Sequence, residues 1–252
     1  MLHVEGLCHH FGGVETLVDL TLHVAAGDVV GLIGPNGSGK TTLFNVITGI
    51  YKPTKGRVRF HDQEISGLEP HEIITRGIAR TFQNLRIYKR MTVFDNVWGA
   101  QHSLPDVSLR ELFLARPRKE RRHREEVERL LELVGLAEHR NMLAQHLTLQ
   151  LQRRLELARA LIRSPKLLLL DEPAGGMTPI ETEKMAALIR DVALPGRTCV
   201  IIEHKMDMIS ALCGRICVLN FGRKIAEGQP DEVLKHSEVL DAYLGHEGRA
   251  HA

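Results

Sequence analysis

The amino-acid sequence predicts an α/β fold in which a mixed β-sheet is interrupted by a helical insertion. The apolar run Val29–Ile33 leads through a glycine-rich loop into a helical pattern near Lys40, which is the order of a strand, a turn and a helix. Two later apolar runs, Leu167–Leu170 and Cys199–Ile202, are typical of strands buried on both faces. Residues 84–162 lie between the glycine-rich loop and the first of these two runs, and they have a mainly helical pattern. The sheet is therefore expected to be completed by segments on both sides of the insertion.

Short strand-like runs separated by glycines make up the N-terminal part of the chain. Glycine is common in the turns that join strands, because its backbone adopts conformations that other residues avoid. The expected strands are Leu2–Val4, Leu20–Val24, Val29–Ile33 and Arg57–Phe60, with breaks at Gly13, Gly27 and Gly56. Helical patterns begin only after the glycine-rich loop.

The insertion contains one segment with a clear helical period, residues 124–134. Its apolar residues recur three or four positions apart, as one face of a helix requires. They are Val127, Leu130, Leu131 and Val134.

Strand patterns return at Leu167–Leu170, Cys199–Ile202 and Arg215–Leu219. Between the first two, Thr178 and Pro179 form a typical helix start. Threonine is a good N-cap, and proline suits the first helical position, where no backbone hydrogen bond is lost.

Residues Gly34 to Thr41 read GPNGSGKT and form a complete phosphate-binding loop between a strand and a helix. In such a loop the backbone N–H groups and the helix dipole point at one anionic site. Lys40 can reach the outer phosphates of a nucleotide, and the hydroxyl of Thr41 can bind Mg²⁺. The alternative is a glycine-rich turn before a structural helix. The candidate nucleotide-binding residues here are Gly34, Asn36, Gly37, Ser38, Gly39, Lys40, Thr41 and Thr42.

Two later strands each deliver titratable side chains to the edge of the sheet where ligands collect. Asp171 and Glu172 follow the first strand, and we expect Asp171 to hold Mg²⁺ and Glu172 to orient or deprotonate an attacking water. Glu203 and His204 follow the second, and a neutral His204 could sense the γ-phosphate. The competing interpretations are two solvated acids and a structural histidine. Gln83, in the stretch Arg80–Gln83, could donate to the attacking water or bind Mg²⁺, although this signal is weak alone.

The order of the loop, Gln83, the acidic pair and the histidine resembles the nucleotide-binding subunit of ABC transporters over nearly the whole chain. The resemblance implies a P-loop NTPase core that hydrolyses ATP with Mg²⁺, an N-terminal antiparallel β subdomain and an inserted α-helical subdomain. Within a single nucleotide-binding domain, residues 1–83 and 163–252 would form the core and residues 84–162 the helical subdomain.

The resemblance also assigns roles to single residues. Gln83 would begin a flexible loop that contacts the membrane subunit, Asp171 would be the metal ligand, Glu172 the catalytic base and His204 the γ-phosphate sensor. Phe11 matches the aromatic residue that stacks on adenine, although an ordinary core aromatic is the alternative.

Three segments are similar to the ATPases of branched-chain (hydrophobic) amino-acid importers, with urea and other amide importers as close relatives. They are Gln152–Ala160, Ile202–Asp207 and Ala242–Gly245. In that family the cargo is recognised by other subunits. The implied partners are a second ABC ATPase subunit, transmembrane permease subunits and, indirectly, an extracytoplasmic solute-binding protein.

The family's signature, usually LSGGQ, is altered to Leu147–Leu151 here. Thr148 keeps a hydroxyl and remains a candidate for contacting the partner's nucleotide, but Leu149 and Gln150 replace both glycines. Since paired subunits complete each other's sites in this family, we expect a heterodimer with one competent and one degenerate site. Thr178 is a second departure, because Asp or Asn is usual there.

Bulk composition agrees with a cytoplasmic enzyme attached to the inner face of the plasma membrane through a partner. The 33 basic and 31 acidic residues give a net charge of +2, too small an excess for a nucleic-acid-binding surface. No run approaches the ~20 apolar residues of a membrane helix, and the four scattered cysteines are expected to be reduced. The basic run 116–124 is expected to be a solvated loop and helix face, or alternatively a contact with anionic headgroups or an acidic loop of the membrane subunit.

Two functions of other classes remain open. One is a subunit that binds ATP but turns over slowly, which the altered signature favours and the intact Glu172 and His204 disfavour. The other is an ABC ATPase without a transport role; its members usually join two nucleotide modules, whereas this chain has one set of motifs.

Overall fold

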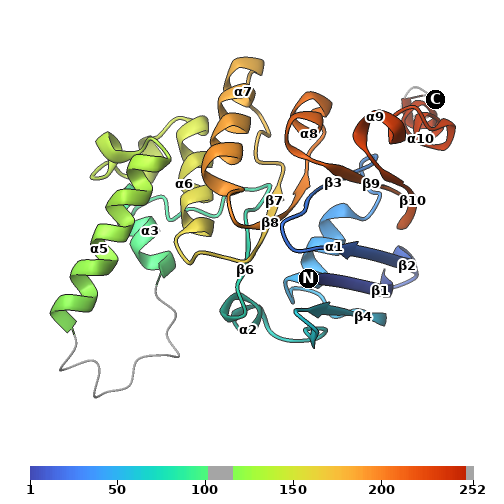
Figure 1. Ribbon diagram of the computed structural model, residues 1–252, viewed down its shortest axis with the longest axis horizontal. Helices are drawn as coiled ribbons and strands as arrows, with labels where there is room; N and C mark the ends of the chain where they lie inside the picture. Colours follow the sequence, from blue (N-terminus) through green and yellow to red (C-terminus); the bar gives the residue numbers. More distant parts are fainter. Residues whose placement is uncertain (102–115, 248–252) are drawn as a thin grey trace. The chain divides into compact units, whose positions relative to one another are not determined.

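The computed structural model describes residues 1–101 and 116–247, which form two compact units (Figure 1). The first unit contains Met1–Arg80, Lys166–Glu172 and Gly196–Ala252, and the second contains Thr81–Pro165 and Pro173–Pro195. The sequence placed the whole of residues 163–252 with the core. The structure instead groups Pro173–Pro195 with the helical unit.

The first unit begins with a four-stranded antiparallel sheet in the order β2-β1-β4-β5. Its strands are β1 Leu2–Phe11, β2 Val14–Val24, β4 Lys55–Phe60 and β5 Gln63–Glu64. β1 is longer than the predicted Leu2–Val4, because irregularities after Val4 and Leu7 let the strand continue past Gly6. The register irregularities also explain why simple alternation is lost in the sequence of β1.

The second sheet of this unit has six strands in the order β10-β9-β3-β8-β7-β6. They are β3 Val29–Ile33, β6 Ile78–Arg80, β7 Leu167–Asp171, β8 Thr198–Ile202, β9 Arg215–Asn220 and β10 Arg223–Gly228. β10 is antiparallel to β9 and the other pairs are parallel, so the predicted mixed sheet is confirmed. β6 is only three residues long, and β10 is mostly polar, which is why neither was predicted from an apolar pattern.

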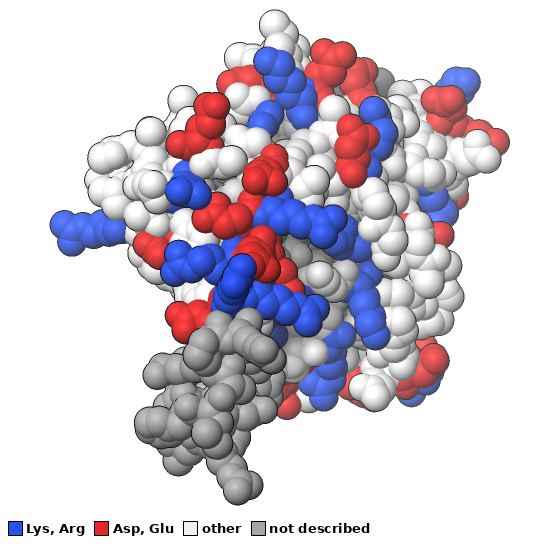
Figure 2. Space-filling model, turned by 60° about the vertical axis from the view of Figure 1, so that its left-hand side comes forward, with Lys and Arg blue, Asp and Glu red and all other residues white. Residues whose placement is uncertain are grey.

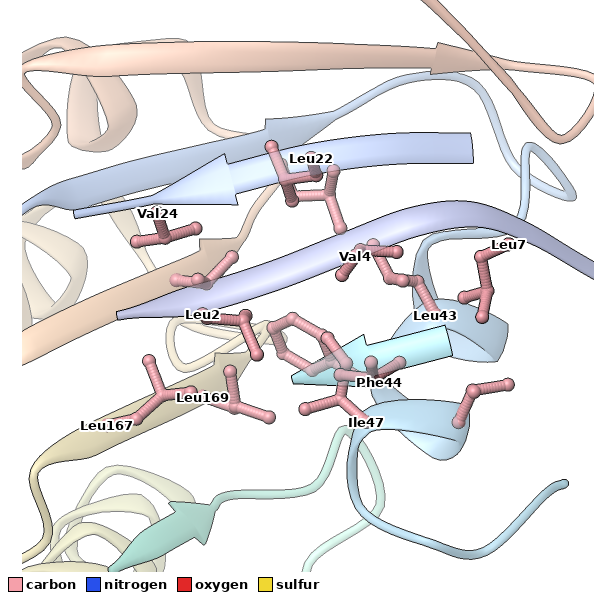
Figure 3. Packing of buried hydrophobic residues seen from close by; sticks show 14 of the residues in the cluster. Leu2, Val4, Leu7, Leu22, Val24, Leu43, Phe44, Ile47, Leu167 and Leu169 are labelled. Carbon is pink, nitrogen blue, oxygen red and sulfur yellow. The ribbon is translucent and has the colours of Figure 1, made fainter. Parts of the chain in front are cut away.

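Helix α1, Lys40–Ile47, lies in the core of the first unit. Its Leu43, Phe44 and Ile47 are buried in one cluster with residues of β1 and β7, as the close view shows (Figure 3). This packing fixes the helix that starts at the glycine-rich loop, because burying large apolar side chains stabilises by ~1.5–3 kcal/mol each. The other helices of this unit are α2 Pro70–Thr75, α8 Met206–Leu212, α9 Pro230–Val233 and α10 Ser237–Glu247.

The second unit is helical and has its own core. Its helices are α3 Val93–Gln101, α5 Arg116–Leu133, α6 Leu149–Leu161 and α7 Pro179–Leu188, with short helical turns at Ala137–His139, Ala144–His146 and Ile189–Ala193. Val127, Leu131 and Val134 are fully buried in this core, as the helical period predicted. The expectation of helix from residue 84 is wrong, because residues 81–92 contain neither helix nor strand and α3 starts at Val93.

Helix α7 begins as predicted, with Thr178 as its N-cap and Pro179 in the first turn. The Thr178 hydroxyl accepts from the Glu181 N–H at 3.4 Å, and the Glu181 carboxylate accepts from the Thr178 N–H at 2.9 Å. This reciprocal arrangement is a capping box. Among the described residues, no helix is long and apolar enough to cross a membrane.

Candidate active site

The phosphate-binding loop joins β3 to α1 in the first unit, as the sequence predicts. Two of its glycines are required by close approach of other backbone. A Cβ at Gly34 would lie 2.0 Å from the Leu219 carbonyl oxygen, and one at Gly39 would lie 2.5 Å from that of Thr16. Both glycines also have positive φ angles, 144° and 103°. Only glycine fits these positions, so β9 and β2 together set the shape of the loop.

Lys40 is buried, and its ammonium group is held inside the loop. Its Nζ donates to the carbonyl oxygens of Gly34 at 2.7 Å and Pro35 at 2.9 Å. Burial lowers the pKa of Lys40, while the nearby carboxylates of Glu172 and Asp171 act in the opposite direction. A desolvated cation held inside the loop is suited to receiving an anionic ligand.

Asp171 is buried at the end of β7 and forms an ion pair that sequence reasoning missed. The Arg80 guanidinium at the end of β6 donates to Asp171 Oδ2 at 2.7 Å and to Asn45 Oδ1 of α1 at 2.6 Å. The side chains of Arg80 and Asp171 are 5% and 1% exposed. Burial raises the pKa of Asp171, although the Arg80 hydrogen bond and charge oppose this rise. Arg80 therefore connects β6, β7 and the helix that follows the phosphate loop.

Glu172 and His204 come together at the same sheet edge. The His204 Nε2 lies 3.0 Å from Glu172 Oε1, and the Glu172 N–H donates to the Ile202 carbonyl of β8 at 2.9 Å. Glu172 has a left-handed backbone with φ 47°, a conformation that costs energy in residues other than glycine. The parallel register of β7 and β8 places Asp171 opposite Ile202, and this brings residues 172 and 204 within reach.

The turn that carries His204 is held by Glu203. The buried Glu203 carboxylate accepts from the backbone N–H groups of His204 at 3.1 Å and Lys205 at 3.4 Å. Sequence reasoning placed Glu203 at this edge without giving it a role. These two hydrogen bonds fix the turn that leads from β8 to Lys205, the N-cap of α8.

Phe11 lies at the end of β1 and is 46% exposed. Its ring contacts those of His9 and Tyr51 edge-on, with centroids 4.7 and 5.1 Å away. An exposed aromatic face supported by two other rings fits a base-stacking role better than a core position.

The residues of the first unit suit a nucleotide triphosphate with Mg²⁺. Gly34 and Gly39 leave space that a Cβ would fill, and Lys40 supplies a cation. The Thr41 hydroxyl and the Asp171 carboxylate are the hard oxygen ligands that Mg²⁺ prefers. The other loop residues, Asn36 and Gly37, are exposed, Ser38 and Gly39 are buried, and Thr42 is half-buried.

Gln83 and Thr148 belong to the second unit. Gln83 is exposed in the segment between β6 and α3. Thr148 caps α6, since its Oγ1 accepts from the Leu151 N–H at 3.4 Å. Leu149 is 42% exposed, and its Cδ2 lies 3.0 Å from where a Cβ at Gly176 would stand. The altered signature thus presents a leucine side chain at the start of α6, beside the loop that follows Glu172.

Two of the buried cysteines lie close together in the sequence: Cys213 follows α8 and Cys217 lies on β9. Among the described residues, no group of three His, Cys, Asp or Glu could hold a metal. In the basic run, Arg121 and Arg122 pair with Glu125 and Glu126 at 3.0 and 3.2 Å.

Figure 2 shows basic and acidic side chains interspersed over the face that carries α5. This mixture favours the interpretation of the basic run 116–124 as a solvated surface. The side chains of residues 116–119 of this run are not among those that the structure describes.

Sequence profiles of two protein families match this chain. The family described as "ABC transporter" matches residues 17–175, and the one described as "Branched-chain amino acid ATP-binding cassette transporter" matches residues 223–249. The second match covers β10 and the C-terminal helices.

Curated relatives are similar over almost their full length. The high-affinity branched-chain amino acid transport ATP-binding protein LivG of Escherichia coli (strain K12) is 40% identical over 249 residues, covering 97% of this chain and 98% of the relative. The corresponding protein BraF of Pseudomonas aeruginosa is also 40% identical, with the same coverage.

Solved structures agree with these relatives. An ATP-binding cassette of an ABC transporter, MJ1267 in its ADP conformation, has a TM-score of 0.85 and 33% identity, covering 97% of this chain and 98% of the other. A nucleotide-free ATP-binding cassette gives a TM-score of 0.84 with 32% identity, covering 96% and 98%. The dimeric cassette MJ0796, bound to ADP and Pi, is 26% identical with a TM-score of 0.75, covering 91% and 99%.

Proposed function

Because this chain belongs to the ABC transporter family of ATP-binding proteins, we propose that it powers an importer of branched-chain or other hydrophobic amino acids by hydrolysing ATP. The relatives LivG and BraF are named for transport of branched-chain amino acids. In this proposal permease subunits hold the chain at the cytoplasmic face of the membrane. A solute-binding protein outside the membrane delivers the cargo to them.

The observation that carries this function is the 3.0 Å contact between His204 and Glu172 at the sheet edge that carries Asp171. Glu172 accepts the proton of the attacking water, and His204 fixes the direction of its carboxylate. Lys40 and the N–H groups of the loop hold the phosphates, while Phe11 stacks on the adenine.

Thr41 and Asp171 are the proposed ligands of Mg²⁺, with Gln83 as a further candidate for the metal or the water. The chemistry that Mg²⁺ supplies when bound is neutralisation of the charge on the phosphate oxygens. Arg80 holds one oxygen of Asp171 through its 2.7 Å hydrogen bond, so the carboxylate has a fixed orientation.

The altered signature favours a heterodimer. Leu149 and Gln150 stand where the family's glycines let a backbone N–H approach the partner's nucleotide, and the Leu149 side chain is exposed there. The N-terminus of α6 still presents its dipole, a contribution of about 0.3–1 kcal/mol. The nucleotide bound by this chain then meets an intact signature from a different subunit.

Hydrolysis is tested with Glu172→Gln in the complete transporter reconstituted in vesicles. Loss of a catalytic base is expected to lower the rate of ATP hydrolysis by roughly 100-fold or more, with ATP binding retained. Uptake of labelled leucine should fall in parallel. Unchanged hydrolysis in this variant would refute the assignment of the base.

The heterodimer is tested by measuring ATP hydrolysis of the chain alone and after mixing with a second subunit. The isolated chain should hydrolyse ATP slowly and be activated by a partner with an intact signature. The double substitution Leu149→Gly with Gln150→Gly should raise the activity of the isolated chain by roughly 5-fold, the equivalent of ~1 kcal/mol. A double alanine variant, which keeps both Cβ atoms, should gain less. High activity of the unaltered chain alone would refute the asymmetry.

A slowly hydrolysing regulatory subunit is the second candidate, and the exposed Leu149 is the observation that favours it. Vanadate trapping of nucleotide in the complex separates the two functions, since only a hydrolysing site forms the trapped state.

A further inference from the structure

Three charged side chains of α6 hold the segment that contains Gln83 by its backbone. They are Arg153, Glu156 and Arg159, spaced three residues apart along the helix. Glu156 Oε1 accepts from two backbone N–H groups, those of Phe82 at 3.3 Å and Arg86 at 3.2 Å. One carboxylate oxygen thus gathers two points of the chain that are four residues apart.

The two arginines hold the carbonyl groups of the same two residues. Arg153 donates to the Phe82 carbonyl at 3.0 Å, and Arg159 donates to the Arg86 carbonyl. The side chains of α6 therefore bind both the backbone N–H and the backbone C=O of Phe82 and of Arg86. The Arg86 guanidinium also lies 4.1 Å from the centroid of the Phe82 ring, which adds a side-chain contact between the same two residues.

Residues 83–85 consequently form an arch whose two ends meet at Glu156. Gln83 and Asn84 are exposed on this arch, whereas Glu156 and Arg153 beneath it are buried. Arg153 NH1 lies 3.5 Å from Glu156 Oε2, so the carboxylate has a charge partner as well as two N–H donors. Burying charged groups of this kind rarely increases stability over an apolar core of the same volume. A role in fixing the arch accounts for their presence.

We propose that Glu156 is a positioning residue, which with Arg153 and Arg159 fixes the arch 83–85 to α6, so that Gln83 moves together with the altered signature. This inference rests on the proposed ATPase function. Since α6 starts at the signature, a displacement at Thr148 is transmitted to the arch through the helix and these four backbone hydrogen bonds. Residues 83–85 themselves belong to neither a helix nor a strand.

The first test measures amide hydrogen exchange in the full-length chain. Glu156→Ala removes a charged acceptor from two N–H groups, so the Phe82 and Arg86 amides should exchange roughly 10-fold faster or more. Glu156→Gln keeps an Oε1 acceptor and should restore most of the protection. If Glu156→Ala fails to fold, Arg153→Ala replaces it. This variant removes the hydrogen bond to the Phe82 carbonyl, and exchange in the same segment should again become faster.

Arg154→Ala is the matched control. Arg154 is the neighbour of Arg153 on α6 and also donates to one backbone carbonyl, that of Val134, at 3.2 Å. Its removal should leave exchange in residues 82–86 unchanged. Unchanged exchange in both Glu156→Ala and Arg153→Ala would overturn the proposed connection.

The second test measures steady-state hydrolysis in the reconstituted transporter. Glu156→Ala should lower kcat by roughly 10-fold while KM for ATP stays the same, and Glu156→Gln should recover most of kcat. Faster exchange with an unchanged kcat would overturn the positioning role. A transporter whose unaltered chain does not hydrolyse ATP would overturn the proposed function instead, and the exchange rates would still decide whether Glu156 holds the arch.

Discussion

At the scale of single residues, the site depends on side chains whose partners lie far away in the sequence. Arg80 and Asp171 are the clearest case, with a 2.7 Å hydrogen bond between residues 91 positions apart. Nothing near Arg80 in the sequence indicates an acidic partner. The pair forms because the short strand β6 lies beside β7 in the sheet.

Arg80→Ala is expected to destabilise the protein strongly, because it leaves the buried Asp171 carboxylate without its guanidinium partner. The loss should be about 3–5 kcal/mol in urea unfolding, the range for breaking a buried ion pair. Arg57→Ala is the control, since Arg57 pairs with Glu5 at 2.6 Å but both side chains are exposed. Its effect should be far smaller. Equal losses in the two variants would contradict the importance of burial.

Glu156 gives a prediction about pH. Burial raises the pKa of Glu156, against the effect of its N–H donors and of Arg153. The folded protein therefore binds this proton more tightly than the unfolded chain. We compare the free energy of unfolding of the unaltered protein with that of Glu156→Gln. The difference should fall as the pH rises from the ordinary glutamate pKa, about 4.3, to the raised pKa of Glu156 in the folded protein. Above that raised pKa the difference should be constant. Urea titrations of both proteins over this range measure the slope, and a positive slope would contradict the shift.

At the scale of elements, caps and glycines determine where the helices near the site begin. The Thr178 capping box starts α7, and Gly39 with its left-handed backbone starts α1. Both starts were predicted, because each carries a recognisable local sequence signal. The boundary at Val93 was missed, since the preceding segment is held by α6 and not by its own pattern.

Thr178→Ala should cost about 1 kcal/mol, typical of a lost N-cap, by urea denaturation. Thr178→Asp should cost far less, because aspartate is an equally good cap and is the residue expected there in the family. The substitution of threonine for aspartate is therefore not a defect in the structure of α7 itself. A large loss in Thr178→Asp would show that the hydroxyl, which also donates to Glu181 at 2.9 Å, is needed.

At the scale of the whole molecule, the sequence predicted the α/β class, the mixed sheet and the strands that carry the proposed site. These strands are mainly apolar runs of five residues, and functional side chains stand at or just after their ends, so both signals coincide. The polar edge strand β10 carries no such pattern. The grouping of Pro173–Pro195 with the helical unit could not be predicted either, because it depends on contacts such as those of Leu188 and Val192 with the helical core.

The cysteines provide a measure of global unfolding. Burial raises the pKa of both Cys213 and Cys217 to about 12, and raises that of the fully buried Cys199 well above its usual value. Since the thiolate is the reactive form, these three should not react with a disulfide reagent at pH 8 in the folded protein. Cys8, which is only half-buried, should react, and all four should react in denaturant. A Cys8→Ser variant that still shows a rapidly reacting thiol would contradict this.

The left-handed backbone of Glu172 has a consequence for engineering this protein. Glycine or asparagine would adopt a φ of 47° with less strain. A library selected for thermal tolerance alone should therefore enrich these residues at position 172. Such a selection would discard the carboxylate and return robust but inert proteins, so any directed-evolution scheme must screen for turnover in every round.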